Sequence, residues 1–289
     1  MRSDDWRLTE DVDDFMDRAG DFLRSRPGLH IASLTAIERL RARGAAAYGP
    51  GPAFFGRLVD GGEVRAAFHR LPSRGLAPTP LTSRQADALA AHLADLGHQL
   101  PYVSAEDRTA TAFAEAWQRR TGATPTPRVR LRLHRLGTLT PPDPLPAGRG
   151  RAVGEEDRAH LMRWCAEFAA DVGEAVTIDA GSWAGTRFAD KRYTYWERPD
   201  GTPVSMAGAN PMVAGVIQVD PVYTPARLRG HGYAGAVTAE VSRAARAAGA
   251  REVVLYTNAS NRTSNALYQR LGYRPVAEWS VYDFAVSAG

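Results

Sequence analysis

The run VYTPARLRGHGYA, residues 222–234, is the most informative part of this sequence. An apolar run that begins at Val213 ends at Pro225, and apolar residues recur at helical spacing after Gly232. The predicted order is therefore strand, glycine loop, helix. Such a joint favours anion binding, because glycine lets the backbone approach a ligand and the first helical turn presents unpaired N–H groups.

Two arginines, Arg227 and Arg229, add positive charge to this loop and can form two-pronged contacts with phosphate oxygens. No Gly-Lys-Ser/Thr follows, which excludes the phosphate loop of nucleotide hydrolases. The spacing Arg227-x-x-Gly230-x-Gly232, followed by the bulky Tyr233, also differs from the dinucleotide fingerprint. On the loop alone, a tight turn without any ligand remains an alternative.

A second informative run follows a predicted strand over residues 252–257 and reads NASNRTSNALYQRLGYRPV, residues 258–276. Together with the loop it resembles the GNAT superfamily of acyl-CoA-dependent N-acyltransferases. That superfamily combines an R/Q-x-x-G-x-G/A loop with a downstream N-x-x-S-x-x-x-Y-x-x-x-G-Y/F stretch. The matching residues are Arg227, Gly230, Gly232, Asn261, Ser264, Tyr268, Gly272 and Tyr273. The resemblance extends over about residues 203–285.

The resemblance implies an acetyl-CoA cosubstrate and no metal, with the loop holding the pyrophosphate. The side chain expected to hydrogen-bond or protonate the departing thiolate is that of Tyr268, and a backbone N–H near residues 222–224 would stabilise the oxyanion. His231, at the variable position of the loop, would offer an N–H to phosphate. The residues that the resemblance implies for binding the acetyl-CoA donor are Val222, Tyr223, Thr224, Arg227, Arg229, Gly230, His231, Gly232, Tyr233, Ala234, Asn258, Asn261 and Ser264.

The sequence leaves the general base open. Asp220 lies near the end of the central strand, whereas Glu197 and Asp179 lie in segments that could line the site. A histidine has a suitable pKa, but His231 belongs to the phosphate loop and is not favoured as the base.

Composition sets the class of protein. Hydrophobic residues make up 44% and charged residues 24% of the 289 residues, as in ordinary globular proteins. No apolar run approaches the roughly 20 residues of a membrane span, and the polar first residues lack the apolar core of a signal peptide. A single cysteine, Cys165, excludes internal disulfides and is expected to be an inert buried thiol. We therefore expect a cytoplasmic protein.

The charge pattern argues against a nucleic-acid partner. The formal net charge is +4, and all but one of the 36 basic residues are arginines, spread along the chain. Residues 128–136 alternate arginine with apolar residues, which predicts a half-buried strand with one arginine face. Self-association as a homodimer is an alternative to a monomer that the sequence leaves open.

The domain organisation follows from a proline-rich segment, residues 141–150, which we interpret as a linker. Residues 151–289 would form the catalytic domain, and residues 1–140 a degenerate GNAT-like copy that cannot bind CoA. The first part shows a comparable order of elements but lacks R-x-x-G-x-G before its helix over residues 82–97. The expected fold is α/β with two tandem domains, each a twisted mixed sheet flanked by helices. An unrelated α/β cap is the alternative for residues 1–140.

Aromatic residues between the linker and the central strand are more typical of a core than of a substrate pocket. Trp164 lies in a predicted helix that opens after residues 154–157, and Trp183 and Phe188 lie in a second predicted helix over residues 176–189.

The sequence therefore predicts an N-acetyltransferase that acts on a primary amine of a small molecule or peptide by direct attack. Three alternatives remain: an acyl-CoA sensor without turnover, a tandem acyltransferase of a small-thiol or antibiotic pathway, and a tRNA-dependent aminoacyl transferase. Tyr268 argues against the sensor, because binding alone does not require it. The intact pyrophosphate loop argues against the tRNA-dependent enzyme.

Overall fold

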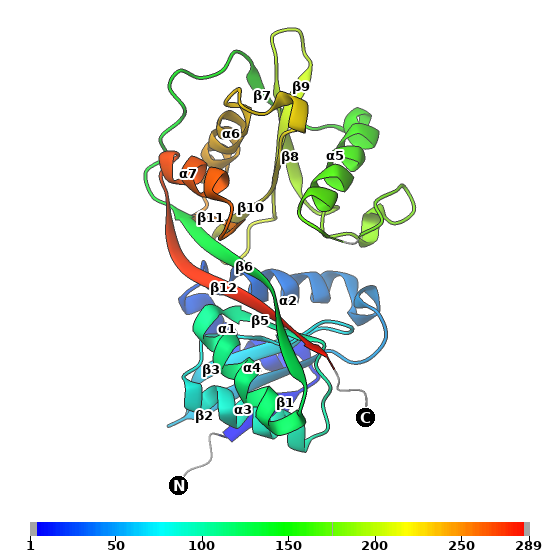
Figure 1. Cartoon of the computed structure of the whole chain (residues 1–289), viewed down its shortest axis with the longest axis vertical. Coiled ribbons are helices and arrows are strands. Elements are labelled where there is room, and N and C mark those ends of the chain that lie inside the picture. The colour runs from blue at the N-terminus through cyan, green and yellow to red at the C-terminus, as the bar shows by residue number, and fades with distance from the viewer. Residues whose placement is uncertain (1–4, 175, 286–289) are drawn as a thin grey trace. The chain divides into compact units, whose positions relative to one another are not determined.

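The computed structural model describes residues 5–174 and 176–285, and its chain divides into two compact units (Figure 1). The first contains Met1–Leu133, Asn258–Ser260 and Val276–Gly289, and the second contains His134–Thr257 and Asn261–Pro275. The expected linker, residues 141–150, thus falls within the second unit. Residues 1–4 and 286–289 of the expected domains lie outside the described residues.

The first unit has a four-stranded sheet in the order β1-β2-β3-β4, in which neighbouring strands are antiparallel. A further strand, β5, pairs antiparallel with the end of β12 through Trp279 to Asp283. The elements in chain order are β1 (Asp5–Thr9), α1 (Val12–Ser25), α2 (Ile31–Arg43), a short 3₁₀ turn (Ala45–Tyr48), β2 (Phe54–Asp60), β3 (Glu63–Arg70), β4 (Ala77–Pro78), α3 (Ser83–Asp95), β5 (Tyr102–Glu106), α4 (Asp107–Thr121) and β6 (Thr124–Leu136).

The second unit has a mixed sheet in which β11-β10-β9-β8-β7 are neighbours in that order and β10 and β11 are parallel. The elements that follow β6 in the chain are β7 (Arg149–Ala152), a 3₁₀ turn (Glu155–Asp157), α5 (Arg158–Asp171), a 3₁₀ turn (Trp183–Gly185), β8 (Arg192–Glu197), β9 (Pro203–Ala209), β10 (Val216–Tyr223), a 3₁₀ turn (Ala226–Leu228), α6 (Tyr233–Ala247), β11 (Glu252–Asn258), α7 (Arg262–Arg270) and β12 (Tyr273–Ala285).

The element order occurs twice along the chain. The series β1-α1-α2-β2-β3-β4-α3-β5-α4-β6 is followed by β7-α5-turn-β8-β9-β10-α6-β11-α7-β12, in which the 3₁₀ turn at Trp183–Gly185 stands where α2 stood. This repetition, with helices flanking each sheet, confirms the expected α/β fold, and the sheet that contains β10 and β11 is mixed.

Two apolar clusters lie on opposite faces of the second unit's sheet. Successive residues of a strand point to opposite faces. Accordingly, Tyr195 packs with α5, whereas its neighbour Trp196 packs with α6 and α7. The α5 cluster also contains Trp164, Trp183 and Phe188, so the expectation that these aromatics belong to a core is confirmed.

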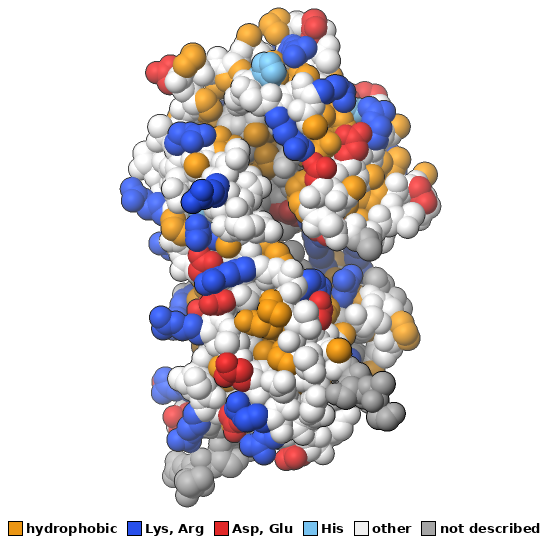
Figure 2. Space-filling view, viewed as in Figure 1, with side chains coloured by type: hydrophobic (Ala, Val, Ile, Leu, Met, Phe, Trp, Pro, Cys, Tyr) orange, Lys and Arg blue, Asp and Glu red, His pale blue; other side chains and the backbone are white. Residues whose placement is uncertain are grey.

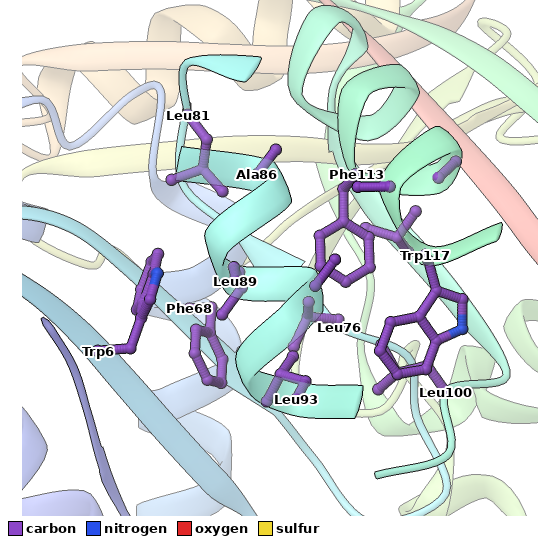
Figure 3. Packing of buried hydrophobic residues seen from close by; sticks show 14 of the residues in the cluster. Trp6, Phe68, Leu76, Leu81, Ala86, Leu89, Leu93, Leu100, Phe113 and Trp117 are labelled. Carbon is purple, nitrogen blue, oxygen red and sulfur yellow. The ribbon is translucent and has the colours of Figure 1, made fainter. Parts of the chain in front are cut away.

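The core of the first unit lies between α3, α4 and the sheet (Figure 3). Figure 3 shows Leu89 and Leu93 of α3 close to Leu76 and to Phe113 of α4, with Trp117 one turn further along α4. All five side chains are buried. Apolar side chains thus fill the region between α3 and α4.

The arginine face of β6 is paired with carboxylates. Arg128 binds Asp283, Arg130 lies 3.3 Å from both Asp107 and Glu278, and Arg132 lies 2.6 Å from Glu278. Figure 2 likewise shows blue basic side chains interspersed with red acidic ones on the visible face. Neighbouring acids therefore offset the charge of this arginine row.

The predicted helix over residues 176–189 is wrong, because the described part of this segment holds only the turn Trp183–Gly185. Asp179 Oδ1 accepts from Ser182 N at 2.8 Å, and Ser182 Oγ donates to Thr177 O at 2.9 Å. Such local bonds compete with helical ones. The sequence also gave no signal for the short strands β1 and β7. Among the described residues, no helix is long and apolar enough to cross a membrane.

Candidate active site

The loop between β10 and α6 presents free backbone donors at the start of a helix. Gly230 and Gly232 have φ angles of +82° and +79°, which side-chain-bearing residues rarely adopt. Gly232 precedes α6 without a side-chain cap. Within the described residues, the N–H groups of residues 230–235 donate to no protein acceptor. This end of α6 therefore offers several N–H groups and the positive end of the helix dipole to an anion.

The corresponding helix of the first repeat, α3, is closed by its own side chains. Thr82 Oγ1 accepts from Gln85 N at 3.2 Å, and Gln85 Oε1 accepts from Thr82 N at 2.9 Å. This capping box occupies backbone N–H groups at the start of α3, whereas the corresponding N–H groups of α6 have no side-chain cap. The described part of the first repeat thus lacks the anion-binding geometry of the second.

Arg229 joins the loop to α5. Its Nε donates to Thr224 O at 3.0 Å, and its Nη2 lies 2.5 Å from Asp171 Oδ2. His231 donates from Nδ1 to Arg229 O at 2.9 Å and stacks on Tyr233 with ring centroids 5.6 Å apart. The side chain of Arg227 is exposed. The structure thus gives Arg229 and His231 contacts that shape the loop, and leaves Arg227 in solvent.

The strand pair β10–β11 opens toward this loop. The two strands pair from Val216 to Gln218 only, against Glu252 to Val254. On its other side β10 pairs with β9, with a register shift between Val219 and Val222. The later residues of β10 therefore keep backbone groups on the β11 side that β11 does not use. An extended ligand can bind such groups as an added strand does.

The register shift also changes the face to which β10 directs its side chains. In a regular strand, residues 219 and 223 would share a face. Instead Val219 packs with α6 and α7, and Tyr223 packs with α5. Because β-bulges re-aim side chains in this way, the bulge brings Tyr223 next to α5.

Tyr223 donates from Oη to Glu167 Oε2 at 2.8 Å. Its ring lies edge-on to those of Trp164 and Phe168, at 6.1 and 6.4 Å. Burial and the bond to Glu167 raise the pKa of Tyr223, so the phenol stays protonated. Sequence reasoning missed Glu167. The only available signal was its place on the α5 face that includes Trp164 and Phe168.

Hydrogen bonds also fix the end of β10. Ser205 Oγ lies 3.1 Å from Tyr223 O and 2.8 Å from Thr224 Oγ1, and Ser205 is fully buried. Ser205 thus donates to the carbonyl of Tyr223, and Arg229 donates to the carbonyl of Thr224. Val222 is half-buried and packs against the α6–α7 cluster. The backbone orientation at residues 222–224 is thus fixed before any ligand binds.

Tyr268 lies on α7 with 8% of its surface exposed. Burial raises its pKa, so the hydroxyl carries a proton at neutral pH. Within the described residues, no hydrogen bond occupies this hydroxyl. One turn earlier, Asn265 Oδ1 accepts from Thr257 Oγ1 at 2.7 Å and lies 3.1 Å from His134 Nε2. This buried network fixes the helix that carries Tyr268.

The asparagines of the motif have structural contacts. Asn261 Oδ1 accepts from Ser264 N at 3.0 Å and so caps α7. Asn258 Oδ1 accepts from Ser260 N at 3.0 Å and from Ser260 Oγ at 2.7 Å. Both side chains therefore shape the backbone of their own segments.

Two of the candidate bases are held in ion pairs. Asp220 binds both Arg187 and Lys191, and although burial raises its pKa, these cations hold the value at about 2. Glu197 is buried and lies 2.5 Å from Arg151 Nε. Because cations occupy both carboxylates, the geometry argues against both residues as the general base.

Asp179, the third candidate base, and Cys165, the single thiol, also have local explanations. Asp179 is exposed and accepts from Ser182, which lowers its pKa. Cys165 is buried, and burial raises its pKa to about 11, as expected of an inert thiol. Among the described residues, no group of His, Cys, Asp and Glu side chains has a geometry that could hold a metal ion.

Comparison with known proteins identifies the class. Residues 159–273 match the sequence model of the acetyltransferase (GNAT) family, and this match spans the loop, α6 and Tyr268. These residues therefore belong to the GNAT family and form an acyltransferase domain. The comparison with curated proteins returns no match.

Solved structures share the fold over both repeats. A GCN5-related N-acetyltransferase from Sphaerobacter thermophilus is 20% identical, with a TM-score of 0.55 over 86% of this chain and 84% of its own. One from Kribbella flavida is 19% identical, with a TM-score of 0.51 over 89% and 96%. A tandem GNAT protein from the clavulanic acid biosynthesis pathway is 14% identical, with a TM-score of 0.54 over 96% and 98%. At these identities the likeness shows the fold alone.

Proposed function

We propose that this protein is an N-acetyltransferase that transfers an acetyl group from acetyl-CoA to a primary amine of a small molecule or peptide. The observation that carries the proposal is the uncapped start of α6, with its two positive-φ glycines, beside the opened β10–β11 pair. A pyrophosphate fits the free N–H groups of residues 230–235. An extended pantetheine chain fits the unused backbone edge of β10.

The end of β10 supplies the electrostatic part of the mechanism. Bonds from Ser205 and Arg229 hold the carbonyls of Tyr223 and Thr224, which fixes the peptide groups around them. A fixed backbone N–H at residues 222–224 stabilises the oxyanion without reorganising during the reaction.

The acceptor amine must lose a proton before it attacks. For an alkylamine with a pKa of about 10.4, deprotonation at pH 7 costs about 4.6 kcal/mol. Glu167 is the carboxylate that the structure brings to the end of β10, through its bond with Tyr223. Asp220 and Glu197 are bound closely by cations, whereas Glu167 lies 4.0 Å from its nearest paired cation, Arg163, so Glu167 is our candidate base. Trp164 and Phe168 give this side of the site apolar walls, which also favour the neutral amine.

The departing thiolate needs a proton, and Tyr268 holds one. Attack by the amine nitrogen forms the C–N bond, and collapse of the intermediate breaks the C–S bond. Glu167 takes the first proton from the ammonium group. Tyr268 gives its proton to the thiolate and regains one that the new amide nitrogen loses. One proton is released overall, and no covalent enzyme intermediate forms.

Calorimetric titration of acetyl-CoA into wild type and Gly230→Asp tests the donor. We expect micromolar affinity in wild type and a loss of at least about 100-fold in the variant, because a carboxylate would face the phosphates. Gly249→Asp is the matched control: Gly249 has a φ of +89° and, like Gly230, open space around its Cβ position. Equal loss in both variants, or no binding by wild type, would refute the donor assignment.

Release of free thiol from acetyl-CoA in the presence of primary amines separates an enzyme from a sensor. An enzyme releases thiol in proportion to the acetylated amine. Tight acetyl-CoA binding with no thiol release across a panel of alkylamines, arylamines and peptides would favour the sensor instead.

A further inference from the structure

The segment expected to be a linker is docked onto the helices of the second unit. Residues 138–148, which we call the proline strap, follow β6 and precede β7. Thr140 N donates to Leu271 O at 3.0 Å, and just before the strap Gly137 N donates to Gly272 O at 3.0 Å. A Cβ on Gly272 would meet Thr138 O at 1.8 Å. The strap is thus fixed at the end of α7.

The middle of the strap lies against the first turn of α6. A Cβ on Gly235 would meet Pro142 Cγ at 3.2 Å, and a Cβ on Gly232 would lie 3.8 Å from Pro146 Cγ. At its far end, a Cβ on Gly148 would meet Glu197 O at 2.1 Å. The glycines of α6 therefore leave room both for an anion and for the strap.

The side chains of the strap divide into two sets. Leu139, Pro142 and Pro146 are half-buried, and Leu139 packs against the α6–α7 cluster. The other strap residues are exposed, including Pro141 and Leu145. Proline restricts the backbone and has no N–H, so the prolines of the strap stiffen it and contribute no backbone donor of their own.

We propose that Pro142 and Pro146 form a wall of the site that binds the nucleotide half of CoA, so that the strap sets the affinity for the donor. The inference rests on the proposed function, because it assumes that the phosphates bind at residues 230–235. Pro146 lies beside Gly232, which is one of the residues with free N–H groups. A nucleotide bound to these groups therefore meets the strap on one side, and its apolar proline rings exclude water from that side.

The test compares Pro142→Gly/Pro146→Gly with the matched variant Pro141→Gly/Leu145→Gly, which changes exposed positions of the same strap. Calorimetry with CoA and with 3′,5′-ADP measures the nucleotide half without any chemistry. We expect the first variant to weaken both affinities about 10-fold and the matched variant to leave both within about 2-fold. Thermal melting monitors folding in each case.

Acetylpantetheine, which lacks the nucleotide, separates a wall from a general distortion. Its KM should be the same in wild type and in Pro142→Gly/Pro146→Gly. Unchanged CoA and 3′,5′-ADP affinities in that variant, or tighter binding as expected of an obstructing strap, would overturn the inference while wild-type acetyl-CoA binding still supports the proposed function. Equal losses in both strap variants would also overturn it.

Discussion

Tyr223 and Glu167 are joined by a 2.8 Å hydrogen bond that exists because β10 is irregular. Regular alternation from Val219 would direct Tyr223 to the α6 side of the sheet, whereas the bulge directs it to α5. The irregularity thus brings the Glu167 carboxylate to the end of β10, whose later residues are not paired with β11.

Glu167→Gln should lower kcat/KM for alkylamines by about 100-fold or more, the range of general-base catalysis. Arylamines are already neutral at pH 7, so their acetylation should fall much less. Arg163, His160 and Tyr223 are charged or titratable neighbours of this carboxylate, and Asp171 and Arg229 act on Tyr223.

The matched control is Glu155→Gln, which removes an exposed carboxylate just before α5. It should leave the rates with alkylamines and arylamines unchanged. Equal losses for alkylamines and arylamines in Glu167→Gln would indicate a structural role and contradict the assignment as base.

Tyr268→Phe should reduce kcat by about 100-fold with little change in acetyl-CoA affinity, because only the proton donor is removed. Burial raises the pKa of this phenol, so its proton is available throughout the neutral range. Tyr273→Phe is the control: its hydroxyl is bound to Ser242 at 2.7 Å, so its loss should affect stability and spare kcat. Steady-state kinetics measures kcat, and calorimetry measures acetyl-CoA affinity, in both variants. A Tyr268→Phe enzyme with wild-type kcat would refute the role of Tyr268 as the acid.

Asp220→Asn should destabilise the protein by about 3–5 kcal/mol, the usual cost of breaking a buried ion pair from one side. The side chain of Lys191, which binds Asp220, is only 2% exposed. Urea unfolding measures the change, and Asp220→Asn with Lys191→Met should recover much of it. A destabilisation below about 1 kcal/mol would show that the pair contributes little.

The pH dependence of this pair has a definite sign. The folded pKa of Asp220, about 2, is lower than the unfolded value of about 3.9. Its contribution is therefore complete above about pH 5 and is lost as the pH falls from about 4 to about 2. The stability difference between wild type and Asp220→Asn should shrink over that window in acid-unfolding experiments.

Asn265→Leu should cost about 1–3 kcal/mol, because it removes the buried partner of Thr257 and His134. Since Asn265 precedes Tyr268 by one turn, we expect kcat to fall while CoA affinity is kept. Asn265→Asp retains the accepting oxygen toward Thr257 and should recover part of the rate. Unfolding curves and kcat measured on the same preparations check both effects, and wild-type kcat in Asn265→Leu would exclude positioning.

The sequence was sufficient to predict β10, the glycine loop and α6, because each of these elements depends on local patterns. The run from Val213 to Pro225 and the helical spacing after Gly232 correspond to β10 and α6. The repeated order of elements was also visible, since periodicity and turn residues mark each element locally.

What the sequence could not provide depends on contacts between distant residues. Glu167 and Tyr223 are 56 positions apart, and only the bulge brings them together. The position of Asp220 near the end of a strand made it a candidate base. The structure pairs it with two cations from the segment before β8, and their contacts with Asp220 have no local sequence signal. The strap was interpreted from its prolines as a linker, whereas its docking depends on glycines in α6 and α7.

The division of the chain has a consequence for synthesis. The first unit includes Val276–Gly289, and β5 pairs with Trp279 to Asp283 near the C-terminus. During translation the edge of β5 therefore lacks its partner until Trp279 to Asp283 have left the ribosome. Unpaired strand edges favour aggregation, so the nascent protein depends on β12 to protect an element that was made long before it.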